Sequence, residues 1–194
     1  MKVAVAAAAL LISFTAQSQQ IDAAVGASVL KAPPASSAIG NYSPQSLRGG
    51  LYPTVAADVL LKHSFGVGAE VSWRAHSGLY AGYQPFRPLF YDVNAVFAPS
   101  FGKAGLAVQA GMGEEKLTVS QGNFNCGYFI DCATYNSSSH LLVHVGFAFR
   151  YYALRNFFVS PDANLYFVRD NTLFSSGHAQ RFGISVGYSF RRER

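Results

Sequence analysis

The sequence predicts an all-β chain folded into an up-and-down antiparallel barrel of eight transmembrane strands. Three observations lead to this fold class. Apolar residues recur at every second position over segments of about ten residues, which is the period and length of a strand that crosses a bilayer at a tilt. The connections between these segments alternate strictly between long and short, as an up-and-down barrel requires. Only 13% of the residues are charged, against about 25% in an ordinary soluble protein.

The first half of the chain contains four of these segments. The expected strands cover residues 22–30, 52–61, 65–74 and 87–98. Their apolar faces carry mainly Val, Ala and Leu. The stretch 31–51 is rich in Pro, Ser, Gly and Asn, so it predicts a long loop. Residues 62–64 form a short turn and residues 75–86 a medium loop.

The second half contributes the other four strands. They cover residues 104–119, 140–152, 157–169 and 180–190. The turns 99–103 and 153–156 are short, whereas 120–139 is a long loop and 170–178 a further loop. The run Glu114-Glu115-Lys116 is expected to lie above the bilayer.

The last segment shows the alternation most clearly. Its large apolar side chains share one face, and small or polar residues occupy the other. The apolar residues are Phe182, Ile184, Val186, Tyr188 and Phe190. Aromatic residues should also gather at both membrane boundaries. We expect one girdle at the periplasmic edge, made by Phe65, Phe101, Tyr151, Phe157, Tyr188 and Phe190. We expect a second at the outer edge, made by Trp73, Leu89, Tyr91 and Phe167.

The amino terminus has the features of a secretory signal peptide. Lys2 supplies the positive charge, residues 3–14 form a short apolar core, and small residues precede a cut after Ser18. The expected domains are therefore a signal peptide at 1–18, a barrel at 19–190 and a basic periplasmic tail at 191–194. In an exported chain, Cys126 and Cys132 are expected to form a local disulfide, with free thiols as the alternative.

The inward faces of the strands carry charges of both signs. Because an eight-stranded barrel is just wide enough for side chains to fill it, unpaired charges there would be costly. We expect a paired polar network that plugs the barrel, and an ion pathway gated by a salt bridge is the alternative. The expected members are Asp58, Glu70, Arg74, Asp92, Gln109, His144, Arg150, Asp162, Asn164 and Arg181. In particular, Arg150 or Arg181 should pair with Glu70, Asp92 or Asp162.

These patterns together resemble the small bacterial outer-membrane barrels of the OmpA/OmpX type. The most specific part is the terminal strand, with Gly183, Val186, Tyr188 and Phe190, which resembles the signal that the barrel-assembly machinery recognises in that family. One departure is that residues 191–194 follow the final aromatic residue. The resemblance implies an outer-membrane location and a barrel without a peptidoglycan-binding domain.

Two alternatives assign a different activity. A lipid A-modifying enzyme needs Ser, His and a carboxylate held together. The places where Ser and His lie close together in the sequence are His76 with Ser77, His140 with Ser137–Ser139, and His178 with Ser175 and Ser176; none has a carboxylate at recognisable spacing. A soluble lipocalin-like carrier would have the opposite polarity, with an apolar cavity and a polar exterior.

The sequence thus favours a monomeric outer-membrane barrel that is not an enzyme. Its role would be structural or interactive, through the loops 31–51 and 120–139. Adhesion, envelope stabilisation, defence against complement and a small pore all remain open. Expected partners are outer-membrane lipid and lipopolysaccharide, the barrel-assembly machinery and an extracellular molecule. The dispersed charge of +5 gives no nucleic-acid-binding stripe, and no cofactor or metal site is evident.

Overall fold

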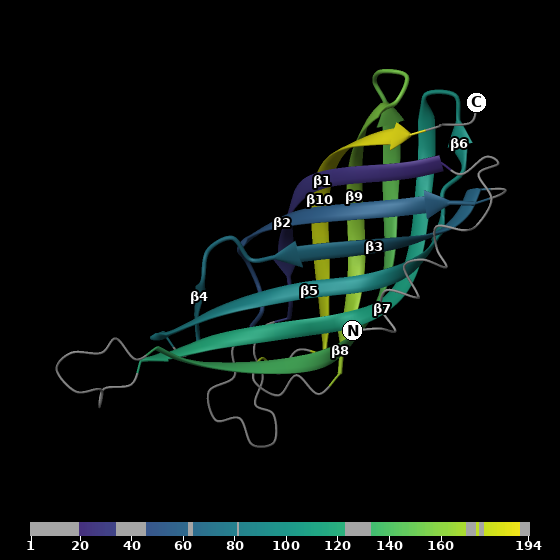
Figure 1. The fold of residues 1–194 in the computed structure, drawn as a ribbon. Helices are drawn as coiled ribbons and strands as arrows, with labels where there is room; N and C mark the ends of the chain where they lie inside the picture. The colour runs from purple at the N-terminus through teal and green to yellow at the C-terminus, as the bar shows by residue number, and fades with distance from the viewer. Residues whose placement is uncertain are drawn as a thin grey trace, which may run out of the picture.

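The computed structural model describes residues 20–33, 46–61, 64–80, 82–122, 133–169, 174 and 177–190. These residues form almost only β-strands (Figure 1). The strands are β1 (Gln20–Lys31), β2 (Leu51–Leu60), β3 (Phe65–Trp73), β4 (Gly78–Tyr80), β5 (Gln84–Phe97), β6 (Ser100–Phe101), β7 (Ala104–Gly122), β8 (Ala133–Tyr152), β9 (Phe157–Val168) and β10 (His178–Phe190). Among the described residues, no helix is long and apolar enough to cross a membrane.

Eight long strands close into one antiparallel barrel. The hydrogen-bonded order is β5-β3-β2-β1-β10-β9-β8-β7, and the pairing of β5 with β7 completes the ring. The seam between the two ends of the chain is fully paired, with Ile21 opposite Phe190 and Lys31 opposite Gln180. The short strands β4 and β6 add to β5 and β7. The predicted eight-stranded up-and-down barrel is therefore confirmed.

The β7–β8 hairpin is longer than the sequence analysis predicted. The two strands stay in register until Gly122 opposite Ala133, so residues 120–122 and 133–139 are strand rather than loop. The serine-rich run 137–139 has no alternation of apolar and polar residues, so the sequence predicted a loop. Regular backbone pairing with β7 nevertheless makes it part of a strand. Residues 123–132, with Cys126 and Cys132, lie outside the described residues, and the expected disulfide stays a prediction.

Apolar side chains cover the outside of the barrel. Val71, Val145 and Phe182 are 40%, 50% and 47% exposed, whereas Glu70 and Arg150 are 9% and 7% exposed. This is the polarity of a barrel in lipid and the reverse of a lipocalin-like carrier.

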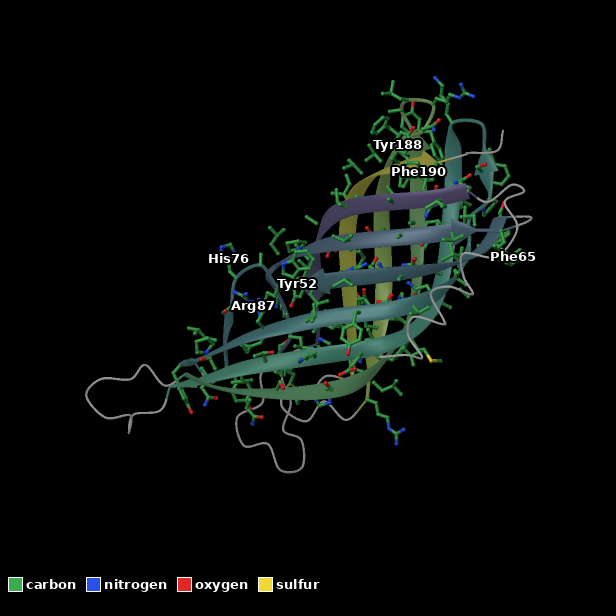
Figure 2. All side chains as sticks on the ribbon, in the orientation of Figure 1. Tyr52, Phe65, His76, Arg87, Tyr188 and Phe190 are labelled. Atoms are coloured by element: carbon green, nitrogen blue, oxygen red, sulfur yellow. The ribbon has the colours of Figure 1, made fainter. Side chains whose placement is uncertain are left out.

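Exposed aromatic residues gather at one end of this apolar surface. Phe65, Tyr188 and Phe190 lie at one end of the barrel, and His76 and Arg87 lie toward the other (Figure 2). The first end also carries exposed Phe101 and Phe157. Rings contact one another there, with Tyr188 packed edge-on against both Phe157 and Phe190.

The interior has three levels: a polar and ionised middle one lies between two that are mainly apolar. The outer level is an apolar cluster, named here the outer plug, whose members come from seven of the long strands and from two loops. Its buried residues are Leu30, Ala32, Leu47, Tyr52, Phe86, Phe90, Leu117, Leu142, Tyr166, Val168, Phe174 and Ala179. A smaller apolar cluster of Leu60, Val96, Ala98 and Ala107 lies toward the opposite end. In the outer half, loop residues Leu47 and Phe174 join the strand residues and fill the lumen largely with apolar side chains, which the sequence analysis did not predict.

Candidate functional site: the polar interior and the outer rim

Arg150 on β8 links strands across the lumen. Its Nη1 lies 2.5 Å from Asp22 Oδ2 on β1, and its Nη2 lies 2.6 Å from Asp58 Oδ2 on β2. Gln20 donates a hydrogen bond of 2.8 Å to Asp22. The guanidinium also lies over the ring of Phe158, 5.2 Å from its centre. One cation thus holds two carboxylates that face each other in the β1–β2 register.

Arg181 on β10 is the second centre of positive charge. Its Nη1 contacts Glu70 Oε1 on β3 and donates a 3.1 Å hydrogen bond to Ser72. Its Nη2 lies 3.6 Å from Asp162 Oδ2 on β9. The side chain is 1% exposed and stacks near Tyr166, 5.4 Å from the ring centre. The structure therefore brings together Arg181, Glu70 and Asp162, three of the residues that the sequence analysis grouped.

A third group is built on His144 and the amides. His144 Nε2 lies 2.5 Å from Asn94 Oδ1 and 3.4 Å from Asp92 Oδ1. Asn94 in turn donates a 2.8 Å hydrogen bond to Asp92. Nearby, Gln109 donates to Asn164 at 2.9 Å, and Asn164 donates to Asp162 at 2.9 Å. Asp92 is thus held by neutral and imidazole groups rather than by an arginine.

We name the three groups together the central polar layer. Among its described members, five carboxylates face two guanidinium groups and one imidazole; the carboxylates are Asp22, Asp58, Glu70, Asp92 and Asp162. A cavity of about 50 Å³ lies among them, which is room for a few water molecules. Apolar clusters lie on both sides of the layer. The ion pairs of Arg150 and Arg181 thereby link strands across the lumen.

Some expected members lie elsewhere, and some members were missed. Arg74 is half-buried near the outer plug, with its guanidinium over the ring of Phe86 at 5.0 Å. Asp22 and Ser72 belong to the layer but were absent from the expected list. The alternation of β1 places Asp22 inward, so its face was predictable. Glu115 was expected above the bilayer, yet it is fully buried inside the barrel, because β7 continues without a break past Glu114.

Of the serine and histidine residues of the enzyme alternative, the fold brings Ser138 and His140 close to a carboxylate. Ser138 Oγ lies 3.1 Å from His140 Nε2, and Glu115 stands directly across from His140 in the register. This carboxylate comes from the neighbouring strand, so sequence spacing could not show it. All three residues share the inward face of β7 and β8 with Leu117 and Leu142, whereas lipid acyl chains lie outside. His76, Ser77 and His178 are exposed, and Ser175 and Ser176 lie outside the described residues.

The terminal strand that resembles an assembly signal forms the closing strand of the barrel. Gly183 and Gly187 face the lumen, where an added Cβ would lie 2.7 Å from an Asp162 oxygen at the first position and would overlap the Phe158 ring at the second. Glycine at these two positions therefore leaves room for the Asp162 and Phe158 side chains of other strands. Val186 and Phe190 face outward. Ser18 and residues 191–194 lie outside the described residues, and within the described residues no group of His, Cys, Asp and Glu could hold a metal ion.

Comparison with solved structures finds the same architecture in several outer-membrane proteins. Neisserial surface protein A (NspA) superposes with a TM-score of 0.61 at 10% identity, covering 89% of this chain and 97% of that one. Ail, the attachment invasion locus protein of Yersinia pestis, gives 0.58 at 12% identity, covering 90% and 100%. A major outer membrane protein of Thermus thermophilus gives 0.59 at 12% identity, also covering 90% and 100%.

These likenesses concern the fold, since the identities are low. No protein-family model matches the chain, and no characterised protein matches it in sequence. The apolar outer surface, the polar and ionised centre and the closed ring of eight strands are properties of this chain itself. Together they identify the chain as an eight-stranded transmembrane β-barrel of the bacterial outer-membrane type.

Proposed function

We propose that this barrel is a surface-interaction protein of the bacterial outer membrane, which binds an extracellular partner through the projecting end of the β7–β8 hairpin. In this proposal the apolar outer surface anchors the barrel in lipid, and the central polar layer holds its strands together. The observation that carries the proposal is the length of this hairpin, which runs beyond the end of β9 on one side, while β5 accompanies it as far as Val119 on the other.

The projecting end is defined here as residues 115–122 of β7 and 133–140 of β8, and we name it the outer ribbon. On β7, the outward residues change from apolar Met112 to charged Glu114 and Lys116, which marks the end of the lipid-facing surface. The eight ribbon residues of β7 span about 27 Å along the strand at 3.4 Å per residue, and residues 115–119 among them still pair with β5. Among the described residues, the end of the ribbon beyond Val119 and its β8 edge are the parts that can meet other molecules.

The outer ribbon also has a free sheet edge. In the described part of the chain, β9 pairs with β8 only from Leu142 onward, so residues 133–140 of β8 have a strand neighbour on the β7 side alone. Exposed edge strands are usually protected by Lys or Pro. Here the exposed residues are Asn136, Ser137 and Ser139. An unprotected hydroxyl-rich edge is suited to pairing with an extended segment of a partner or to hydrogen bonding with a polysaccharide.

The comparisons add support of a general kind. Ail, which has this fold, is an attachment invasion locus protein and was solved in complex with the heparin analogue sucrose octasulfate. An extracellular protein or sulfated polysaccharide is therefore a reasonable first partner to test. The barrel closes on itself without help from a second chain, so we propose a monomer surrounded by outer-membrane lipid and lipopolysaccharide, assembled by the barrel-assembly machinery through β10.

The test compares bacteria that display the wild-type barrel with bacteria that display a variant in which an Asn-Gly turn replaces residues 119–136. Adherent bacteria on an epithelial monolayer and on immobilised heparin are counted. A second variant, Ser137→Lys, keeps the ribbon but charges its edge, and Lys103→Ser, at the opposite end, is the control. We expect the first two variants to lose binding and the control to keep it. Equal binding by all four proteins would refute the role of the ribbon.

A further inference from the structure

A groove of about 550 Å³ opens on the outside of the barrel at its outer rim. Trp73 and Leu89 form its apolar part, and Arg87, Ser77 and Thr118 are among its polar lining residues. These five side chains lie outside the central polar layer and the outer plug, although Phe86 of the outer plug also lines the groove. The groove therefore calls for its own explanation.

The groove arises from the way the strands pair. Trp73 is the last residue of β3 and stands opposite Leu89 on β5. The chain leaves β5 after Arg74, whose backbone N–H still donates to the carbonyl oxygen of Pro88, and pairing resumes in β4, where Gly78 stands opposite Phe86. On the other side of β5, Arg87 stands opposite Thr118 of β7. The interval between β3 and β4 leaves the outward face of β5 uncovered at the level where the apolar surface ends.

The charge at the groove is positive. Arg87 is exposed, and no acidic side chain of the described residues forms an ion pair with it. Lys116 lies nearby, opposite Leu89. Glu114 partly offsets Lys116: hydrogen bonds from Ser139 and Tyr91 lower the pKa of Glu114, so it stays ionised at neutral pH. Arg87 therefore supplies the uncompensated charge.

We propose that this groove binds the phosphate group of an outer-leaflet lipid, with the phosphate on Arg87 and the adjoining acyl chain on Trp73 and Leu89. The proposal rests on the membrane location argued above. A guanidinium binds phosphate oxygens through paired N–H donors, and the hydroxyl groups of Ser77 and Thr118 can add hydrogen bonds.

A lipid explains the groove better than a free anion does. Along the groove, the apolar side chains of Trp73 and Leu89 give way to the guanidinium of Arg87. This order matches the change from acyl chain to headgroup in a lipid. A free phosphate ion would make no use of the apolar part. The position at the end of the outward apolar stripe also places the cation at headgroup level rather than in hydrocarbon.

Trp73 makes the site directly measurable, because it is the single tryptophan of the sequence. The full barrel is reconstituted in nanodiscs of phosphatidylcholine, and Trp73 fluorescence is followed during three titrations. The titrants are bisphosphorylated lipid A, dephosphorylated lipid A with the same acyl chains, and inorganic phosphate. We expect a saturable change with the phosphorylated lipid alone.

Variants test the assignment to Arg87. Arg87→Gln should weaken binding of the phosphorylated lipid about tenfold, because one charge-assisted contact is lost. Arg87→Lys, which keeps the positive charge, should retain part of the affinity that Arg87→Gln loses. Lys31→Gln removes an exposed cation at the outer end of β1, away from the groove, and should change nothing. Heat-modifiable migration on a detergent gel checks that each barrel is folded.

Three results would overturn the proposal: equal responses to the two lipids, an unchanged response in Arg87→Gln, or the same response to inorganic phosphate, which would indicate a free-anion site. These failures leave the adhesion proposal untouched, since the outer ribbon is tested separately. If the wild-type barrel could not be inserted in lipid at all, both proposals would fall together.

Discussion

Replacing Arg181 by methionine removes the cation that compensates two acidic side chains on other strands. Glu70 and Asp162 would remain in the lumen without their guanidinium partner. Methionine keeps much of the length of the arginine stem, so the change tests charge more than packing. Wild-type Arg181 also donates to Ser72, which would lose this bond.

The expected loss of stability follows from the burial of the two carboxylates that would remain unpaired. Removing one partner of a buried ion pair typically costs about 3 to 5 kcal/mol, because the remaining charge is left uncompensated. The Glu70 and Asp162 side chains are 10% and 17% exposed, so some solvent reaches them. We therefore expect a loss near the lower limit, about 3 kcal/mol in the free energy of unfolding.

A compensating variant separates charge from shape. Adding Glu70→Gln and Asp162→Asn to Arg181→Met leaves no unpaired ionised group at this place. Replacing both partners of a buried ion pair by uncharged residues often changes stability little. The triple variant should therefore recover most of the lost stability, to within about 1 kcal/mol of wild type. Lys103→Met in an exposed turn serves as a control, with an expected change of about 0.5 kcal/mol or less.

The measurement is urea unfolding of the barrel from lipid vesicles, followed by Trp73 fluorescence and analysed by linear extrapolation. The reasoning is refuted if Arg181→Met alone costs less than the control, or if the triple variant is as unstable as the single one. The second result would mean that the arginine acts by filling space and not by pairing.

Three further predictions concern other parts of the barrel. Gly113→Ala should cost about 1 to 3 kcal/mol of stability in the same urea assay, because the new Cβ would overlap the carbonyl oxygen of Tyr91, whereas Gly177→Ala, with its nearest atom at 3.9 Å, should be tolerated. The purified protein should give no steady conductance in planar bilayers, because the outer plug fills the lumen; stable single-channel steps would contradict this. Mass spectrometry of lipid A should show the same acylation with and without expression, since Ser138 and His140 face the lumen; a lost or added acyl chain that depends on Ser138 would restore the enzyme alternative.

Strand number, strand faces and barrel polarity could be read from the sequence because each depends on a local period of two. Val71 and Glu70 are neighbours, and their opposite faces follow from alternation alone. The partners across the lumen could not be read in this way. Arg150 meets Asp22 over a separation of 128 residues, and which residues meet depends on how the ring closes and on its stagger.

The sequence analysis did not predict the outer plug, for a related reason. Its strand members, such as Leu117 and Leu142, look from the sequence like exceptions to a polar inward face. Only the closed ring shows that they lie at one level and that loop residues Leu47 and Phe174 join them. The groove beside Arg87 likewise depends on where β3 stops and β4 begins, which is a property of strand pairing rather than of composition.

The seam between β1 and β10 has a consequence for biogenesis. Because these strands come from opposite ends of the chain, no shorter nascent portion can satisfy its backbone in hydrocarbon. An intermediate lacking β10 would present two unbonded edges to lipid. Insertion must therefore wait until β10 has been synthesised, and the preceding strands have to be kept unfolded, and protected from aggregation, until then.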